Sequence, residues 1–149
     1  MENNRLILTQ KLTKIYSMGQ HQLYALKEVD LSFGPGEFAG LVGPSGSGKT
    51  TFLNIVGSLD IPSKGKVEVL GRQIETLSHK QAAELRKRHI GFIFQTFNLL
   101  PVYTVFENVE FPLILLGVPA SERRQRAVSY THLRAHETRH DLVCRLLLE

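Results

Sequence analysis

The sequence predicts an α/β fold in which an antiparallel β portion precedes a parallel core with flanking helices. Residues 5–16 and 22–33 have the pattern of two strands, for which antiparallel pairing is the simplest arrangement, and a turn follows at residues 34–37. Residues 38–42 then form a short apolar run, typical of a strand buried on both faces. Because a glycine-rich loop and a helical pattern follow this run at once, the chain contains the strand, loop and helix unit of an α/β fold.

The elements after the glycine-rich loop alternate between helix and strand. Residues 51–59 carry apolar side chains at helical spacing, and the segment 60–65 contains the proline and glycine that end this helix. Residues 66–70 are predicted to form a strand that ends at Gly71. Residues 90–94 are again apolar and rich in side chains that favour strands, which predicts one more strand.

A first capping-box pattern marks the start of a helix, because Ser78 is followed by Gln81 three residues later. The residues after Ser78 are rich in Ala, Leu, Glu, Lys and Arg, which favour helices. We therefore expect a helix that runs to about Arg88.

A second capping-box pattern is formed by Thr104 and Glu107. It predicts a helix over residues 105–116, and we expect Pro112 to bend or split that helix because proline lacks a backbone N–H group. A last polar helical stretch is predicted to begin at Ser121.

Size, charge and cysteine content narrow the class of protein. A chain of 149 residues with a net charge of +4 fits one compact domain that favours an anionic partner in general terms. The longest mostly apolar run, residues 111–118, is too short to span a bilayer, and the N-terminus lacks the pattern of a secretory signal. The single cysteine excludes an intramolecular disulfide. A cytosolic chain is the default expectation.

The glycine-rich loop carries the chemistry. Residues 43–50 read GPSGSGKT, which fits the phosphate-binding pattern G-x-x-x-x-G-K-[ST]. Its glycines let successive backbone N–H groups curl around a phosphate, and the helix that follows points its positive end at the same place. Lys49 supplies a charge for the β- and γ-phosphates, Thr50 can bind the Mg²⁺ that bridges them, and Thr51 can contact the α-phosphate side. The predicted nucleotide-binding residues of this segment are Gly43, Pro44, Ser45, Gly46, Ser47, Gly48, Lys49, Thr50 and Thr51.

The loop motif leaves the class of nucleotide-binding protein open. A merely flexible glycine and serine loop is the alternative interpretation, but a position between a predicted buried strand and a predicted helix favours nucleotide binding. The motif by itself does not separate kinases, GTPases and transport ATPases.

Residues 5–127 resemble the first part of an ATP-binding cassette (ABC) transporter ATPase. The phosphate loop has the family's form G-x-x-G-x-G-K-T. Three further segments resemble the branch of the family that contains the lipoprotein-release and macrolide-export ATPases. They are LNIVGSLDIPSKG (53–65), GFIFQTFNLLP (91–101) and ENVEFPLILLGV (107–118). The resemblance implies a P-loop NTPase fold of the ABC-ATPase type, incomplete in this chain.

The resemblance also assigns two site residues outside the loop. Tyr16 is expected to stack on adenine, with an ordinary strand tyrosine as the alternative. Gln95 is expected to reach the Mg²⁺ ion and the attacking water, with a plain surface-loop glutamine as the alternative. The implied catalytic residues are therefore Lys49 and Gln95, and the implied metal ligands are Thr50 and Gln95. In the family, residues matching 96–103 contact the transmembrane partner.

The resemblance further implies an assembly. In the family, two ATP-binding subunits bind Mg·ATP between them, head to tail, and hydrolysis drives an integral-membrane permease. The implied cofactors are ATP and Mg²⁺, and the implied partners are a permease and a second copy of the subunit, with no nucleic acid. The implied location is the cytoplasmic face of the inner or plasma membrane, and the implied substrate is a lipoprotein or a macrolide-like compound. A soluble ABC ATPase that does not serve transport is the alternative.

Later motifs of the family are not in the sequence, namely an L-S-G-G-Q-like stretch, an apolar strand ending in Asp-Glu and a switch histidine. We therefore expect residues 1–127 to be the N-terminal part of an ABC ATP-binding domain, without efficient ATP turnover. Residues 128–133 read VSYTHL, and a nucleotide sequence that encodes them resembles a transposase adapter end. We therefore interpret residues 128–149 as a non-native tail, derived from an adapter or a frameshift. The alternative is that the whole chain is a truncated fragment without function.

Overall fold

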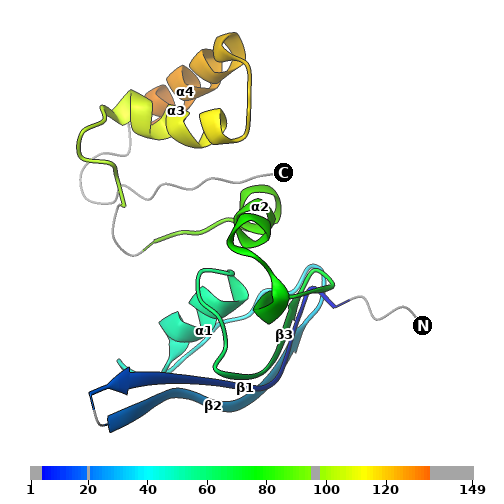
Figure 1. Ribbon diagram of the computed structural model, residues 1–149. Coiled ribbons are helices and arrows are strands. Elements are labelled where there is room, and N and C mark those ends of the chain that lie inside the picture. The colour runs from blue at the N-terminus through cyan, green and yellow to red at the C-terminus, as the bar shows by residue number, and fades with distance from the viewer. Residues whose placement is uncertain (1–4, 20, 95–97, 135–149) are drawn as a thin grey trace. The chain divides into compact units, whose positions relative to one another are not determined.

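The structure is a computed structural model that describes residues 5–19, 21–94 and 98–134. The chain divides into two compact units, residues 1–86 and 87–149, and each is taken by itself. Figure 1 shows strands and helices in the first unit and helices in the second.

The first unit is built on a four-stranded antiparallel sheet (Figure 1). Its strands follow the spatial order β2-β1-β3-β4 and comprise β1 (Ile7–Met18), β2 (His21–Phe33), β3 (Lys64–Val69) and β4 (Arg72–Gln73). Strand β1 pairs antiparallel with both β2 and β3. The strands predicted at residues 5–16, 22–33 and 66–70 are therefore confirmed, and so is the antiparallel pairing of the first two.

Helix α1 (Lys49–Val56) packs against the strands of this sheet and builds the core of the first unit. Its side chains Phe52 and Ile55 are buried, as are Leu12 on β1 and Val67 on β3. Full burial of one such side chain contributes roughly 1.5–3 kcal/mol. The helix predicted after the glycine-rich loop is confirmed.

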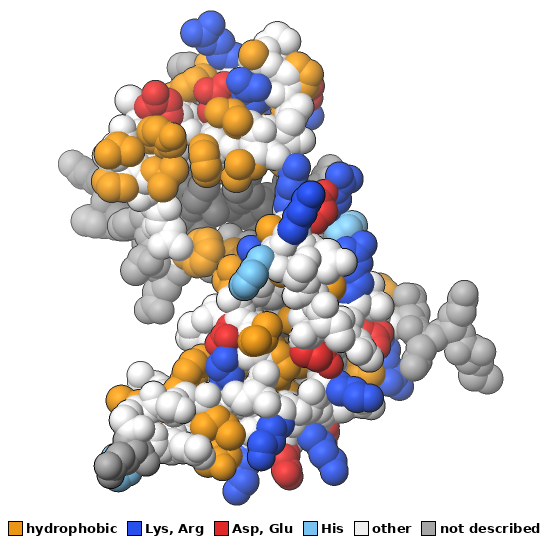
Figure 2. Space-filling model, in the orientation of Figure 1, with side chains coloured by type: hydrophobic (Ala, Val, Ile, Leu, Met, Phe, Trp, Pro, Cys, Tyr) orange, Lys and Arg blue, Asp and Glu red, His pale blue; other side chains and the backbone are white. Residues whose placement is uncertain are grey.

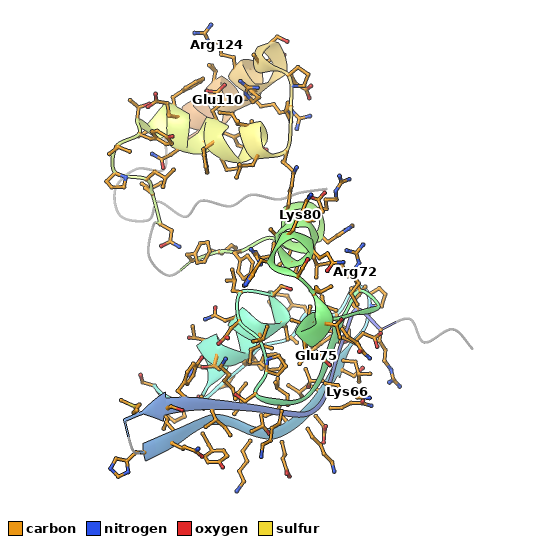
Figure 3. All side chains as sticks on the ribbon, in the orientation of Figure 1. Lys66, Arg72, Glu75, Lys80, Glu110 and Arg124 are labelled. Carbon is orange, nitrogen blue, oxygen red and sulfur yellow. The ribbon has the colours of Figure 1, made fainter. Side chains whose placement is uncertain are left out.

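The short 3₁₀ helix η1 (Ile74–Thr76) precedes helix α2 (His79–His89). Helix α2 is the helix predicted from the first capping box. The Ser78 backbone N–H donates to Gln81 Oε1 at 2.9 Å, and the Gln81 backbone N–H donates to Ser78 Oγ at 3.3 Å. Lys and Arg side chains gather on the surface over this helix in Figure 2, and Figure 3 labels Lys80 on the helix.

The second unit contains helices α3 (Val105–Leu115) and α4 (Ala120–Arg134), which pack on each other. The Arg123 Nε group donates to Glu110 Oε1 at 3.1 Å and links the two helices, and Ala127 on α4 is fully buried. Figure 3 shows Glu110 on α3 and Arg124 on α4. Among the helices that the structure describes, none is both long enough and apolar enough to cross a membrane.

Helix α3 begins at the predicted capping box of Thr104 and Glu107. It continues through Pro112 as one helix, so of the two expected effects of Pro112, a bend or a split, the split does not occur. Proline removes one donor of the helical ladder. The bonds on either side remain, because the Asn108 N–H donates to the Thr104 carbonyl at 3.0 Å and the Leu116 N–H donates to the Pro112 carbonyl at 3.0 Å.

Two predicted strands are not formed. Residues 38–42 and 90–94 are irregular, and the side chains of Phe38 and Val42 are fully exposed. An apolar strand is stable only when neighbouring strands accept and donate its backbone hydrogen bonds. Within the described part of the chain, no strand pairs with either segment, and the ladders of the sheet are all antiparallel. The predicted parallel core is therefore absent from these residues, whereas the predicted antiparallel portion and helices are present.

Candidate nucleotide-binding site

The phosphate-loop segment 43–50 leads directly into helix α1. Gly46 and Gly48 have positive φ angles of 80° and 87°, a backbone region that residues with a Cβ rarely adopt. A Cβ at Gly48 would collide with the carbonyl oxygen of Ala25 and with Cδ2 of Leu26, both on β2. The sequence therefore needs glycine at this position for two reasons, a left-handed turn and a close approach to the sheet.

Lys49 is folded back over the loop. Its Nζ group donates to the carbonyl oxygens of Gly43 and Pro44, both at 2.7 Å, and to Ser47 Oγ at 3.2 Å. The Ser47 backbone N–H donates to the Pro44 carbonyl at 3.3 Å and closes a turn. A full positive charge is thus held against the loop backbone, where an anion can reach it because residues 43–47 are exposed.

The start of α1 is open. Gly48 precedes it in a left-handed conformation, no side chain caps the helix, and no acidic residue lies in its first turn. The first N–H groups of a helix have no acceptor within the helix, and the helix dipole places partial positive charge there. Residues 49–51 therefore present backbone donors, with the exposed Thr50 and the half-buried Thr51 among them. This arrangement fits a phosphate.

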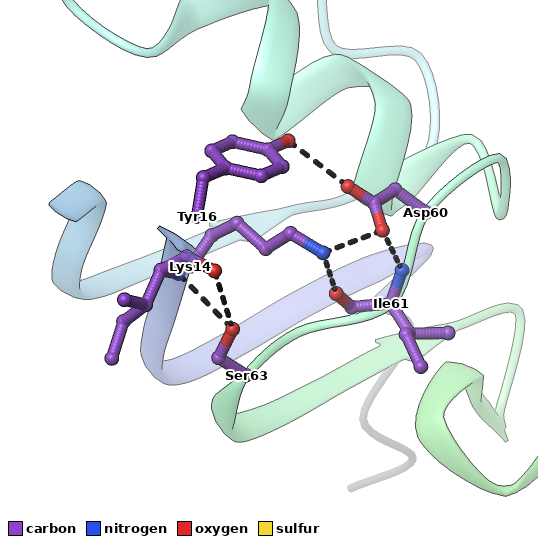
Figure 4. Close-up of polar contacts among 6 residues, drawn as sticks. Lys14, Tyr16, Asp60, Ile61 and Ser63 are labelled. Carbon is purple, nitrogen blue, oxygen red and sulfur yellow. Dashed lines mark hydrogen bonds and ion pairs between the residues drawn. The ribbon is translucent and has the colours of Figure 1, made fainter. Parts of the chain in front are cut away.

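Tyr16 lies near the end of β1, opposite Leu23 of β2. Its side chain is 38% exposed, and its hydroxyl donates to Asp60 Oδ2 at 3.0 Å (Figure 4). The Lys14 ammonium lies 5.1 Å from the ring centroid. The predicted base-stacking residue is therefore an aromatic ring that is partly open to solvent and held at its hydroxyl.

The Asp60 carboxylate accepts hydrogen bonds from Tyr16 and from two neighbouring groups. Its Oδ1 accepts from Lys14 Nζ at 2.6 Å and from the Ile61 backbone N–H at 2.8 Å. Burial raises the pKa of the Asp60 carboxyl, but hydrogen bonds from Lys14, Ile61 and Tyr16 together with the Lys14 charge outweigh burial and hold the pKa below its ordinary value. Asp60 therefore acts as an anion that ties β1 to the segment after α1.

The loop and Tyr16 converge on the same stretch of β2. Gly48 lies against Ala25, and Tyr16 pairs with Leu23, two residues along that strand. Gln95, the predicted second catalytic residue and metal ligand, lies outside the described residues. The structure therefore brings together the predicted phosphate and base sites but says nothing of Gln95.

Sequence reasoning missed two residues of this region, Lys14 and Asp60. A weak signal for Lys14 exists, because residues two apart on a strand share a face and Tyr16 is two residues away. Asp60 lies in the segment 53–65 that carries the family resemblance. Neither signal shows that the two residues meet, because they are 46 positions apart in the chain.

Comparison with known proteins relates the chain to a single family. The ABC transporter family model matches residues 26–146. An uncharacterized ABC transporter ATP-binding protein of Thermotoga maritima is 48% identical over 114 residues, which is 76% of this chain and 49% of the relative. The lipoprotein-releasing system ATP-binding protein LolD of Coxiella burnetii is 42% identical over 131 residues, covering 87% of this chain and 56% of the relative.

Other similarities point the same way. The macrolide export ATP-binding/permease protein MacB of Marinobacter nauticus is 44% identical over 127 residues, 85% of this chain and 20% of the relative. The ATP-binding cassette MJ0796, solved as a dimer in a post-hydrolysis state bound to ADP and Pi, aligns with a TM-score of 0.77 and 44% identity, over 83% of this chain and 54% of that one.

The chain spans about half the length of the ATP-binding proteins that it matches. The family model nevertheless covers most of the sequence, and the solved cassette of similar sequence shares its fold. This chain belongs to the ABC transporter family.

Proposed function

We propose that the protein is the ATP-binding subunit of an ABC transporter and that it binds Mg·ATP through the phosphate loop. The observation that carries this proposal is the open start of α1, where backbone donors and the Lys49 ammonium face the same exposed loop. A relative of this chain has been solved with ADP and Pi, which supports a nucleotide as the ligand.

We propose a role in nucleotide binding for the start of α1, for two loop residues and for Gln95. The backbone N–H groups at the start of α1 hold the phosphates, and Lys49 releases part of its contact with the loop carbonyls to neutralise phosphate charge. Thr50 offers its hydroxyl to the magnesium ion, with Gln95 as the second protein ligand. When bound, Mg²⁺ neutralises charge on the β- and γ-phosphates. Gln95 also orients the attacking water in this proposal.

The proposed partners follow from the relatives. LolD is named as the ATP-binding protein of a lipoprotein-releasing system, and MacB as an ATP-binding and permease protein for macrolide export. We place the intact protein at the cytoplasmic face of the inner or plasma membrane, as a homodimer that couples ATP hydrolysis to an integral-membrane permease. The proposed substrate is a lipoprotein or a macrolide-like compound. Residues 96–103 are the proposed contact with the permease.

Calorimetric titration of the chain with Mg·ATP tests nucleotide binding. We expect Lys49→Ala to weaken binding by at least about tenfold, because a charge-assisted hydrogen bond contributes about 1.5–3 kcal/mol. Lys80→Ala is the matched control, because it removes an exposed lysine from α2 and should leave the affinity unchanged. Equal affinity of Lys49→Ala and the unaltered chain would contradict the proposal.

We further propose that this chain binds ATP without efficient turnover, because its sequence holds no L-S-G-G-Q-like stretch and no Asp-Glu strand end. ATP hydrolysis above the level of the Lys49→Ala variant would refute this part.

The boundary after residue 127 is a proposal too, with residues 128–149 as a non-native tail. Resequencing the locus from an independent library should not return codons 128–149, and their persistence would remove the idea.

A second candidate is a truncated fragment without function, and one observation favours it. Phe38 and Val42 are fully exposed although they are large and apolar, which is typical of a surface that promotes aggregation. Thermal unfolding separates the two candidates. A cooperative transition that moves to higher temperature with Mg·ATP supports the ATP-binding subunit, whereas aggregation without a ligand-dependent shift supports the fragment. A soluble ABC ATPase is distinguished by the absence of a permease gene beside its own.

A further inference from the structure

We propose that Lys14 and Asp60 are positioning residues that hold the Tyr16 ring in place for the nucleotide base. This inference rests on the proposed function, because it concerns the base end of the same site. Tyr16 is the residue expected to touch the nucleotide, whereas Lys14 and Asp60 act through it.

The two carboxylate oxygens of Asp60 have different tasks (Figure 4). Oδ2 accepts the Tyr16 hydroxyl at 3.0 Å, while Oδ1 accepts Lys14 Nζ at 2.6 Å and the Ile61 N–H at 2.8 Å. The bond from Ile61 fixes the rotation of the carboxylate. The position of the tyrosine hydroxyl is therefore set by the backbone of the segment that follows α1.

Lys14 makes the arrangement rigid. The residue is 9% exposed, and its Nζ group also donates to the Ile61 carbonyl at 2.8 Å. A charge with so little access to water requires a partner, and Asp60 supplies it. Because the same ammonium lies 5.1 Å from the Tyr16 ring centroid, the ring gains a cation–π contact in addition to the bond at its hydroxyl.

Helix α1 connects this cluster to the phosphate loop. Gly48 and Lys49 lie at its first turn, and Asp60 follows its last turn, where the Asp60 N–H donates to the Asn54 carbonyl at 3.2 Å. One rigid helix thus fixes the phosphate-binding groups at one end and the anchor of the base-stacking ring at the other. A ring that is already oriented loses less conformational freedom when a base stacks on it, which raises affinity for the base.

The test compares the affinities of the full chain for Mg·ATP and for Mg·tripolyphosphate, which has no base. Tyr16→Phe keeps the ring and removes the bond to Asp60, and we expect ATP to bind about two- to tenfold more weakly while tripolyphosphate is unaffected. Asp60→Ala should give the same pattern. The double variant should bind ATP no more weakly than Asp60→Ala alone, because Asp60→Ala already removes the bond that Tyr16→Phe breaks. Tyr24→Phe is the control, since Tyr24 is an exposed tyrosine on β2 and should leave both affinities unchanged.

Three outcomes would overturn the inference. In the first, ATP binding to Tyr16→Phe and Asp60→Ala is unchanged. In the second, ATP and tripolyphosphate weaken alike, which indicates a general loss of structure. In the third, the unaltered chain binds both ligands equally well, so that the base adds nothing, although phosphate binding stands. If the unaltered chain binds neither ligand, the proposed function fails together with the inference. Unchanged tripolyphosphate affinity with weakened ATP affinity supports it.

Discussion

Helices α1 and α3 begin in opposite ways. At α3, Glu107 Oε2 accepts the Thr104 N–H at 2.7 Å and the Thr104 hydroxyl at 2.8 Å, and the Glu107 N–H donates to Thr104 Oγ1 at 3.3 Å. At α1, a glycine takes the capping position, no side chain accepts from the first turn, and the first turn carries no acid. The first residue of α1, Lys49, is a cation, which the positive end of a helix dipole disfavours.

The difference separates a helix start that is capped by its own side chains from one that is not, and the second is the proposed ligand site. The capped start of α3 gives the Thr104 and Glu107 N–H groups acceptors within the chain and places a carboxylate where an anion would otherwise bind. The open start of α1 leaves donors and a lysine together, an arrangement that costs stability until an anion binds. The asymmetry therefore supports the proposed phosphate site at α1 without reference to any relative, and substitutions at either helix start can test it.

The largest effect is expected from Gly48→Ala. The new Cβ would collide with the Ala25 carbonyl, and the alanine would have to adopt a positive φ angle. We therefore expect the free energy of unfolding to fall by about 2–4 kcal/mol and tripolyphosphate binding to be lost. Gly71→Ala is the matched control, because Gly71 has a φ of 73° but open space around it. Urea titration should show a smaller loss there, about 1–2 kcal/mol. Equal losses at the two glycines would contradict the role of the close approach to β2.

A smaller effect is expected when α1 is given the acid that α3 has. Thr51 is three residues after the capping position, which is where Glu107 lies in α3. Thr51→Glu should weaken tripolyphosphate binding by at least about tenfold, because a carboxylate would compete for the N–H groups and repel the anion. Thr51→Gln has nearly the same size without the charge and should weaken binding less. Calorimetry distinguishes them, and identical affinities for the two variants would show that the open start is not the anion site.

The same contrast explains what could be predicted from the sequence. The capping boxes at Ser78 and Thr104 were predictable because both partners lie three residues apart, so the signal is local. The strand prediction at residues 38–42 was wrong because apolar character does not report whether partner strands are present. The contact between Tyr16 and Asp60 joins residues 44 positions apart and depends on how α1 packs on the sheet, which no local pattern encodes.

The smallest effect is expected when the cap at the start of α3 is removed. Thr104→Ala removes the hydroxyl of the cap and should cost about 1 kcal/mol of unfolding free energy without changing nucleotide affinity.

Hydrogen bonds from the Thr104 backbone and side chain hold the pKa of Glu107 below its ordinary value, so the carboxylate stabilises the folded state at pH values above that ordinary pKa. This stabilisation is lost as the pH falls through the lowered pKa. The difference in stability between the unaltered chain and Thr104→Ala should therefore shrink in acid, as measured by urea titration at several pH values. A difference that stays constant or grows as the pH falls would show that the cap does not depend on the ionised carboxylate.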